Sequence, residues 1–166
     1  MVNKLETYLD FAENDYQHFK FCYKATLVTN QMGAIAQGIC EKYLKHVIEE
    51  YVIVDNAQKN GEKEKILRTH SLAKLLRYVE ENISDFQIEG RKLRIIDGFY
   101  FTARYPGEES ISINEQDVED CNDAVEECRG KVMEYIEKNK ALRKENAIQN
   151  EIISKQLPAK PKRKTR

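Results

Sequence analysis

Two short segments of the sequence carry residues that could bind an anionic ligand. His70 directly follows Thr69, a good helix N-cap, so it would lie in the first turn of a helix, where free backbone N–H groups attract anions. Arg104 and Tyr105 stand before Pro106, at the expected end of another helix. A guanidinium group binds phosphate through two parallel hydrogen bonds, and a tyrosine ring offers a face on which a base can stack. These residue types predict a site for phosphate or nucleotide.

Both segments also have a structural interpretation. An isolated histidine beside a helix cap often serves only as a hydrogen-bonding group of the fold. Arg104 at a helix C-terminus could interact with the last carbonyl groups, while Tyr105 fills the core. The residue types alone leave the two interpretations open.

A third segment, residues 36–46 (AQGICEKYLKH), places several polar side chains near one another on a helix. Gln37, Glu41 and Lys45 recur at steps of four residues, with His46 beside them. Glu41 and Lys45 form an i,i+4 pair in the favourable order, which stabilises a helix by about 0.2–0.5 kcal/mol. Taken alone, this segment predicts an exposed polar helix surface.

The chain has 166 residues, the size of one domain, and is 41% hydrophobic and 33% charged. Seven glycines and three prolines are few, which favours long helices over many turns. Residues 155–166 carry six Lys or Arg and no acidic residue, which leaves 21 basic and 28 acidic residues in the rest. Such an acidic body does not predict broad coating of nucleic acid. The basic end predicts a solvated disordered tail, a short contact with phosphate, or a targeting signal.

The sequence also excludes several classes of protein and site. No apolar run approaches the roughly 20 residues of a membrane span, and no secretory signal is visible, so a cytoplasmic protein is expected. The four cysteines show no CxxC motif, which predicts reduced thiols and no zinc site. No metal and no other cofactor is predicted. The cysteines are Cys22, Cys40, Cys121 and Cys128.

Apolar periodicity predicts an all-α protein, an up-and-down bundle of about five helices. Thr69 is the expected cap of the third helix and Asn114 that of the last, while Pro106 ends the fourth by forcing Tyr105 out of the helical conformation. The polar segment 55–65 has no apolar period and is predicted to be a loop. The expected helices cover residues 3–25, 31–54, 71–83, 91–105 and the chain from residue 115 onward.

Gly33 and Gly38 lie inside the second expected helix. Each costs a helix up to about 1 kcal/mol relative to alanine. Their presence therefore predicts the close approach of another helix.

The last expected helix carries an apolar stripe from Val118 to Tyr135 that should face a core. The stripe weakens at Asn139, and an exposed or frayed helix is expected beyond it. The predicted organisation is a helical bundle over residues 1–140, followed by a helical extension and a basic disordered tail over residues 141–166.

The segments described above resemble the motifs of a known family. Residues 37–45 (QGICEKYLK) resemble its Q-x-x-x-E-K-x-L-K signature, residues 70–76 (HSLAKLL) its H-x-L-x-x-L-L segment, and residues 100–106 (YFTARYP) its Y-x-x-x-R-Y-P ending. The three motifs stand in the expected order on the expected helices. Over about residues 3–137 the chain resembles the HEPN family, the higher-eukaryote and prokaryote nucleotide-binding domain.

The resemblance implies a bundle of five helices that commonly forms a two-fold homodimer. It also implies binding of nucleotide or RNA in a cleft near the dimer interface. Many members are encoded beside a small nucleotidyltransferase, which would be the partner protein. By this resemblance Lys42, Lys45, His70 and Arg104 would meet phosphate, and Tyr105 would stack against a base.

One departure from the family bears on catalysis. The ribonuclease members carry an Arg followed four to six residues later by a His, and no Arg in this chain has a His at that spacing. General acid–base cleavage still requires such a group within hydrogen-bond reach. A binding module without catalytic activity is therefore expected. The alternatives left open are a metal-independent endoribonuclease of toxin type that uses His70 and Arg104, and a module that binds only a protein partner.

Overall fold

The computed structural model describes residues 4–156, with side chains as far as residue 149. The chain divides into two compact units, Met1–Val132 and Met133–Arg166. Regular secondary structure within the described residues is helical throughout, which confirms the predicted all-α class. None of the helices in this part of the chain is both long and apolar enough to cross a membrane.

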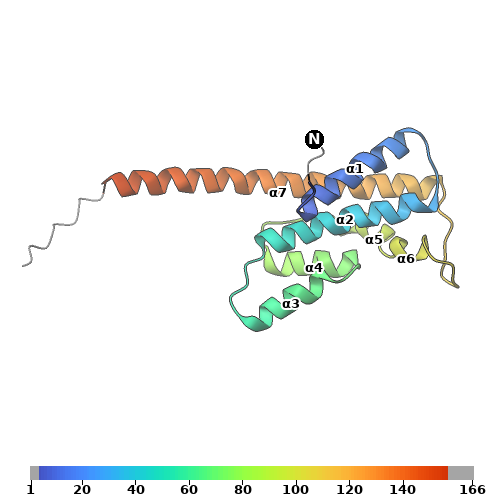
Figure 1. The fold of residues 1–166 in the computed structure, drawn as a ribbon, viewed down its shortest axis with the longest axis horizontal. Helices are drawn as coiled ribbons and strands as arrows, with labels where there is room; N and C mark the ends of the chain where they lie inside the picture. The colour runs from blue at the N-terminus through green and yellow to red at the C-terminus, as the bar shows by residue number, and fades with distance from the viewer. Residues whose placement is uncertain (1–3, 157–166) are drawn as a thin grey trace, which may run out of the picture. The chain divides into compact units, whose positions relative to one another are not determined.

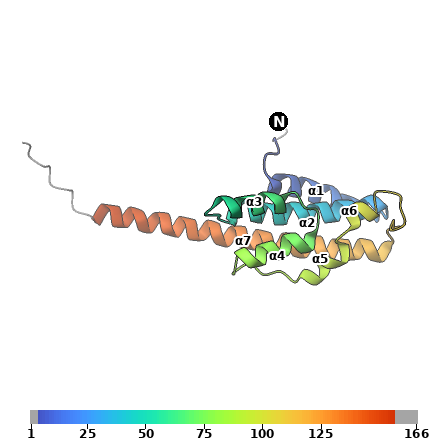
Figure 2. The ribbon, with the colours of Figure 1, turned by 90° about the horizontal axis from the view of Figure 1, so that it is seen from below.

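The first unit is built around its second helix. Figure 1 shows α2 between α1 and α4, and Figure 2 shows the same order from below. α1, α4, α5 and α6 pack against α2, and α3 packs against both α2 and α4. The helices are α1 (Tyr8–Lys24), α2 (Asn30–Tyr51), α3 (Ala57–Leu67), α4 (Leu72–Asn82), α5 (Gly90–Ile96), α6 (Phe99–Thr102) and α7 (Glu115–Gln156).

α2 is buried along most of its length because its sequence is apolar on more than one face. The hydroxyl of Tyr43, fully buried on α2, donates to the carboxylate of Glu13 on α1. Arg129 on α7 donates two hydrogen bonds to the same carboxylate, at 2.9 and 3.0 Å. Charge-assisted bonds of this bidentate kind are strong and directional. One carboxylate thus links three helices of the first unit.

The cysteines are buried free thiols. The thiol of Cys40 on α2 donates to the carbonyl of Ala124 on α7 at 3.7 Å, and that of Cys128 on α7 donates back to the carbonyl of Cys40 at 3.8 Å. Burial raises the pKa of Cys121 to about 12, and it raises the pKa of Cys40 well above its ordinary value. The thiols of Cys40 and Cys121 therefore stay protonated and act as packing groups.

The first helix starts later than predicted. α1 begins at Tyr8 because Thr7 and Asp10 form a reciprocal capping box. The Thr7 hydroxyl accepts from the N–H of Asp10 at 3.2 Å, and the Asp10 carboxylate accepts from the N–H of Thr7 at 2.9 Å. Residues 4–6 are not helical, and the predicted start at Asn3 lies outside the described residues.

The predicted loop at residues 55–65 is wrong, because most of it belongs to α3. Asn56 caps this helix by accepting from the N–H of Lys59 at 2.9 Å. Pairs of polar side chains one turn apart, such as Gln58 with Glu62 at 3.3 Å, support it along its surface. No residue of α3 is fully buried, so the helix has no apolar period from which it could be predicted.

The predicted N-cap of the helix expected over residues 71–83, which is α4 in the structure, is also wrong. Ser71, not Thr69, is the N-cap of α4, and its hydroxyl accepts from the N–H of Lys74 at 3.4 Å. Thr69 instead accepts from the N–H of Ser71 at 3.3 Å. His70 therefore lies in the connection before α4 and not in its first turn.

The single helix predicted over residues 91–105 is interrupted. α5 ends at Ile96, and Gly98 adopts a left-handed conformation with φ of 105° before the four residues of α6. Glycine takes this conformation without the steric cost of a side chain. The chain then turns at Ala103, so α6 ends before the predicted stop at Tyr105.

The last helix begins as predicted, with the Asn114 side chain accepting from the N–H of Asp117 at 3.1 Å. α7 continues without a break to Gln156, within the second unit. The side chains of residues 140–149 are exposed, as expected beyond Asn139. Of the predicted basic tail, residues 157–166 lie outside the described part of the chain.

Close approach to α2 is confirmed at Gly33. A Cβ atom there would lie 2.8 Å from Cδ1 of Ile113 and 3.1 Å from the ring of Phe99 on α6. At Gly38 the prediction was wrong, because the atom nearest to such a Cβ, at 3.4 Å, is Nζ of Lys42 on the same helix.

We expect Gly33→Ala to lower the free energy of unfolding by about 1 kcal/mol, because overpacking costs about 1–3 kcal/mol and helix propensity returns up to about 1 kcal/mol. The matched control is Gly61→Ala on α3, where an added methyl meets nothing within 4 Å. The control should raise the free energy of unfolding by up to about 1 kcal/mol. Urea unfolding followed by circular dichroism measures both. Equal stabilisation by the two substitutions would contradict the close approach at Gly33.

Candidate functional site

Five side chains from two segments of the first unit form an aromatic and cationic cluster. The imidazole ring of His70 stacks on the ring of Tyr100, with centroids 5.0 Å apart and 3° between the planes. The guanidinium carbon of Arg104 lies 4.7 Å from the centre of the same Tyr100 ring and 5.6 Å from that of Tyr105. Phe101 meets His70 and Tyr100 edge-on, at 5.7 and 5.0 Å. The fold thus brings the connection before α4 to the end of α6.

The cluster is open to solvent. The side chain of His70 is 44% exposed, and Phe101 and Tyr105 are 51% and 55% exposed. Within the described part of the chain, the guanidinium of Arg104 has its ring contacts but no hydrogen bond or ion pair. Its N–H donors are therefore available to an anion such as phosphate.

A depression of about 540 Å³ lies beside His70 and Phe101. Its volume falls within the range of about 300–1,000 Å³ that is usual for small-molecule sites. The connection before α4 and the break between α5 and α6 supply most of its wall. It is lined by Gln37, Arg68, Thr69, His70, Ser71, Asp97, Gly98 and Phe101.

Gln37 of α2 fixes both segments of the site. Its side chain is 1% exposed, and its amide nitrogen donates to the backbone carbonyl of His70 at 2.8 Å. Its amide oxygen accepts from the N–H groups of Gly98 and Tyr100, at 3.0 and 2.6 Å. The buried amide thereby holds the left-handed break before α6 and the connection before α4 against the same helix.

Glu41, one turn further along α2, orients the imidazole of His70. Its Oε1 and Oε2 atoms lie 3.2 and 3.1 Å from Nδ1 of His70, and Oε1 also accepts from Nζ of Lys45 at 2.6 Å. A carboxylate only accepts hydrogen bonds, so the proton of this contact is assigned to Nδ1 of His70. Nε2 is then the ring nitrogen left for a ligand.

The N-terminus of α4 is occupied by a side chain of the protein itself. The carboxylate of Asp97 accepts from the N–H groups of Leu72 and Ala73, at 2.9 and 3.1 Å, and from the hydroxyl of Ser71 at 3.1 Å. The expectation that free N–H groups at this end attract an anionic ligand is therefore wrong. Asp97 is the anion that the helix dipole stabilises.

Three of the five predicted site residues meet around Tyr100. His70 and Arg104 both contact its ring, and Tyr105 lies beside Arg104. They come from segments that are separate in the sequence, so their meeting is a property of the fold.

The two predicted lysines are placed differently. Lys45 is 5% exposed and reaches the cluster only through the carboxylate of Glu41. Lys42 forms an ion pair of 2.9 Å with Asp15 on α1 and donates to the carbonyl of Gly38 at 3.2 Å. Both ammonium groups are thus already engaged within the fold.

The exposed polar surface predicted for residues 36–46 is wrong. Gln37, Glu41, Lys45 and His46 are all buried, because other helices cover α2 on several sides. Three of them are satisfied by the contacts described above. The fourth is not: Nδ1 of His46 has no hydrogen-bond partner among the described residues.

Sequence reasoning did not assign Tyr100 and Phe101 as the platform of the cluster, nor Gln37 and Glu41 as its supports, nor Asp97 as a cap. One available signal was the pair Gln37 and Glu41, which stand one turn apart next to a run of apolar residues and so indicate a buried network that needs partners. Another was Asp97 directly before Gly98, since acidic residues and glycine favour turns.

Comparison with known proteins identifies one family. The family model of the HEPN domain matches residues 5–139, most of the 166-residue chain. No curated protein and no solved structure gives a significant match.

We expect Glu41→Gln to lower the free energy of unfolding by about 3–5 kcal/mol, because it leaves the buried ammonium of Lys45 without its partner. Combining it with Lys45→Met removes both charges and should recover most of the loss. Urea unfolding of the two single variants and the double variant yields the coupling energy. Glu81→Gln, in an exposed pair with Arg77, is the matched control and should change stability little. Strictly additive losses would argue against a buried ion pair.

Burial lowers the pKa of His46 below its ordinary value, although Glu50, Glu49 and Asp10 act in the opposite direction. The unfolded chain therefore takes up a proton at His46 more readily than the folded chain does. By linkage, the free energy of unfolding falls as the pH drops below about 6.5, the ordinary pKa of histidine.

Replacing His46 with leucine should remove this acid sensitivity, which amounts to up to about 1.4 kcal/mol per pH unit. The substitution should cost little at pH 8, since the buried Nδ1 of the imidazole has no hydrogen-bond partner among the described residues. Chemical unfolding between pH 8 and pH 5 measures the slope for both proteins. His18→Gln, which removes an exposed imidazole, is the control. An unchanged slope in His46→Leu would assign the acid sensitivity to other groups.

Proposed function

This chain belongs to the HEPN domain family, and from that premise we propose that it is a nucleotide- or RNA-binding module that does not cleave its ligand. Arg104 and His70 contact phosphate, and Tyr105 stacks against a base. The observation that supports this is the meeting of an exposed cation, a partly exposed imidazole and an exposed aromatic ring around Tyr100. Such groups are the ones that bind phosphate and stack on bases in other proteins.

The two lysines have different parts in this proposal. Lys45 neutralises Glu41, and Glu41 in turn holds the ring of His70, so Lys45 acts through its neighbours. Lys42 meets phosphate when the ligand replaces Asp15 as its partner. Arg104 and His70 need no such exchange and carry most of the contact.

Arg104→Ala tests the proposal directly. Hydrogen bonds to charged groups contribute about 1.5–3 kcal/mol, so the affinity should fall by roughly 10- to 100-fold. Titration calorimetry with ATP, GTP and a short RNA measures it, and circular dichroism checks the fold. Arg91→Ala, an exposed arginine on α5, removes the same charge and should bind as the unaltered protein does. Equal affinities for Arg104→Ala and the unaltered protein would remove Arg104 from the site.

A second candidate function is metal-independent cleavage of RNA. It is favoured by an arrangement in which Glu41 contacts Nδ1 of His70, while Nε2 has no hydrogen-bond partner among the described residues and Arg104 shares the Tyr100 ring with His70. Acid–base cleavage needs a ring nitrogen that is free to exchange a proton. The missing Arg-x4-6-His spacing argues against it. Incubation of total RNA with the protein in EDTA separates the two functions. Cleavage that disappears in His70→Gln would replace the binding-only proposal.

The family also leads us to propose a homodimer that works with a small nucleotidyltransferase partner. Exposed aromatic residues such as Phe21, at 74% exposed, are consistent with a surface that is covered in an assembly. Light scattering gives the mass in solution, and co-expression with a nucleotidyltransferase encoded by a neighbouring gene tests the partner. A monomer that co-purifies with nothing would reject this part of the proposal.

A further inference from the structure

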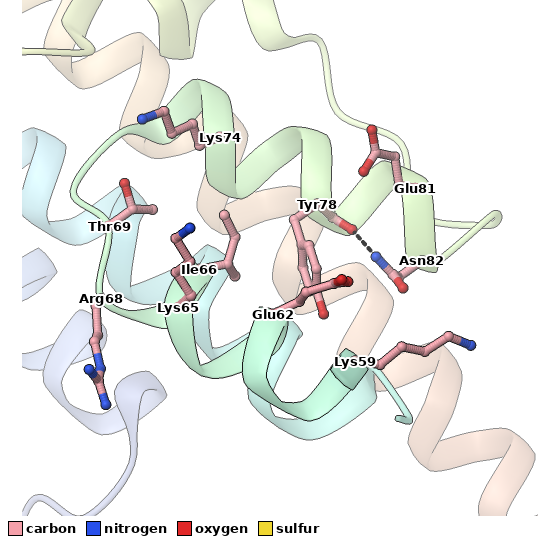
Figure 3. A pocket seen from close by; sticks show the side chains of 10 residues that line it. All are labelled: Lys59, Glu62, Lys65, Ile66, Arg68, Thr69, Lys74, Tyr78, Glu81 and Asn82. Atoms are coloured by element: carbon pink, nitrogen blue, oxygen red, sulfur yellow. Dashed lines mark hydrogen bonds between the residues drawn. The ribbon is translucent and has the colours of Figure 1, made fainter. Parts of the chain in front are cut away.

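A second and larger depression lies between α3 and α4, outside the aromatic cluster. Its volume is about 710 Å³. Figure 3 shows Lys65, Thr69 and Lys74 gathered at one end, with the ring of Tyr78 between the two helices. Hereafter we call it the α3–α4 groove.

The groove is basic, although the chain without its last twelve residues is acidic. Lys59, Lys65, Arg68 and Lys74 line it, against two acidic residues. The two acidic residues and Lys59 have partners: Glu81 pairs with Arg77, Glu62 accepts from Gln58 and Lys59 pairs with Asp55.

The remaining cations of the groove are free to meet a ligand. Among the described residues, the side chains of Lys65, Arg68 and Lys74 form no hydrogen bond or ion pair, and all three are exposed. Exposed like charges that are not neutralised by the fold attract an anion, over a range of about 8 Å at physiological salt.

The groove adjoins the depression beside His70. Arg68 and Thr69 line both, so these two residues lie at their shared edge. The groove also contains a half-buried aromatic ring, Tyr78, as the first site contains Tyr100 and Tyr105. Cations interleaved with aromatic rings along a continuous surface are typical of sites for single-stranded nucleic acid.

We propose that the α3–α4 groove binds the nucleotides next to the one held at His70 and Arg104, so that the ligand is single-stranded RNA and not a mononucleotide. This inference rests on the proposed function of the first site. Lys65 and Lys74 contact phosphates of the chain, Arg68 contacts the phosphate at the junction, and Tyr78 faces an unpaired base. A mononucleotide fills one of the two depressions, whereas a chain of at least two nucleotides fills both.

The double variant Lys65→Ala/Lys74→Ala tests the groove. Anisotropy of a labelled 12-nucleotide single-stranded RNA, measured across salt concentrations, gives the affinity and its salt slope. The salt slope is the slope of the logarithm of the binding constant against the logarithm of the salt concentration. The loss of two phosphate contacts should reduce its magnitude by about 1.4, which corresponds to a roughly 25-fold weaker affinity than that of the unaltered protein at 0.1 M salt. The affinity for ATP, measured by calorimetry, should not change, since ATP occupies the first site alone.

The control is Lys24→Ala/Arg91→Ala, which removes two exposed cations from α1 and α5 and retains the basic end of the chain. It should keep the RNA affinity within about twofold of the unaltered protein, since it removes no phosphate contact. If the groove variant binds RNA as the control does while Arg104→Ala weakens both ligands, the groove proposal is overturned and the proposed function stands. Equal losses for ATP and RNA in the groove variant would also overturn it. If the unaltered protein binds neither ligand, both proposals fall.

Discussion

Buried polar groups on α2 hold the candidate site together. The side chain of Gln37 is buried, so leaving its amide without hydrogen bonds would cost about 1–3 kcal/mol. The partners of this amide are backbone groups of two separate segments. The connection that carries His70 and the break at Gly98 are therefore both fixed to one covered helix. The stacking of His70 on Tyr100 follows, because Gln37 anchors the backbone of both residues and Glu41 orients the imidazole ring.

The buried contacts around α2 also determine which charged groups near the cluster remain unpaired. Glu41 is compensated by Lys45 and also contacts Nδ1 of His70, and Asp97 is compensated by the N-terminus of α4. Neither carboxylate is then an unpaired negative charge beside the cluster. In the described chain the guanidinium of Arg104 has two ring contacts and no hydrogen bond or ion pair. The rings stabilise its position by about 0.5–1 kcal/mol each without satisfying its donors. A positive group therefore remains available on an acidic protein.

The helices that bury an apolar face could be predicted from the sequence, because their apolar residues recur at helical spacing. The elements that depend on caps, polar pairs or distant hydrogen bonds could not. α2, α4 and α7 carry apolar residues at helical steps, so their type and approximate bounds were predictable. α3 has no buried residue and depends on a cap and on polar pairs, which periodicity does not detect. The break at Gly98 depends on an acceptor 61 residues away, the side chain of Gln37. The motif residues His70 and Arg104 could be named from the sequence, but their shared ring could not.

Net charge is a poor guide to what such a protein binds, and the pairing of each cation is a better one. Lysines on α1, α2 and α5 pair with carboxylates of neighbouring helices at 3.0, 2.9 and 3.4 Å, so their charge is used in packing the bundle. Lys65 and Lys74 have no such partners in the described chain. Because salt screens a charge beyond about 8–10 Å, the acidic residues on distant faces hardly weaken the field at the α3–α4 groove. An acidic bundle can therefore present a basic groove, provided that the cations of the groove are the ones left unpaired.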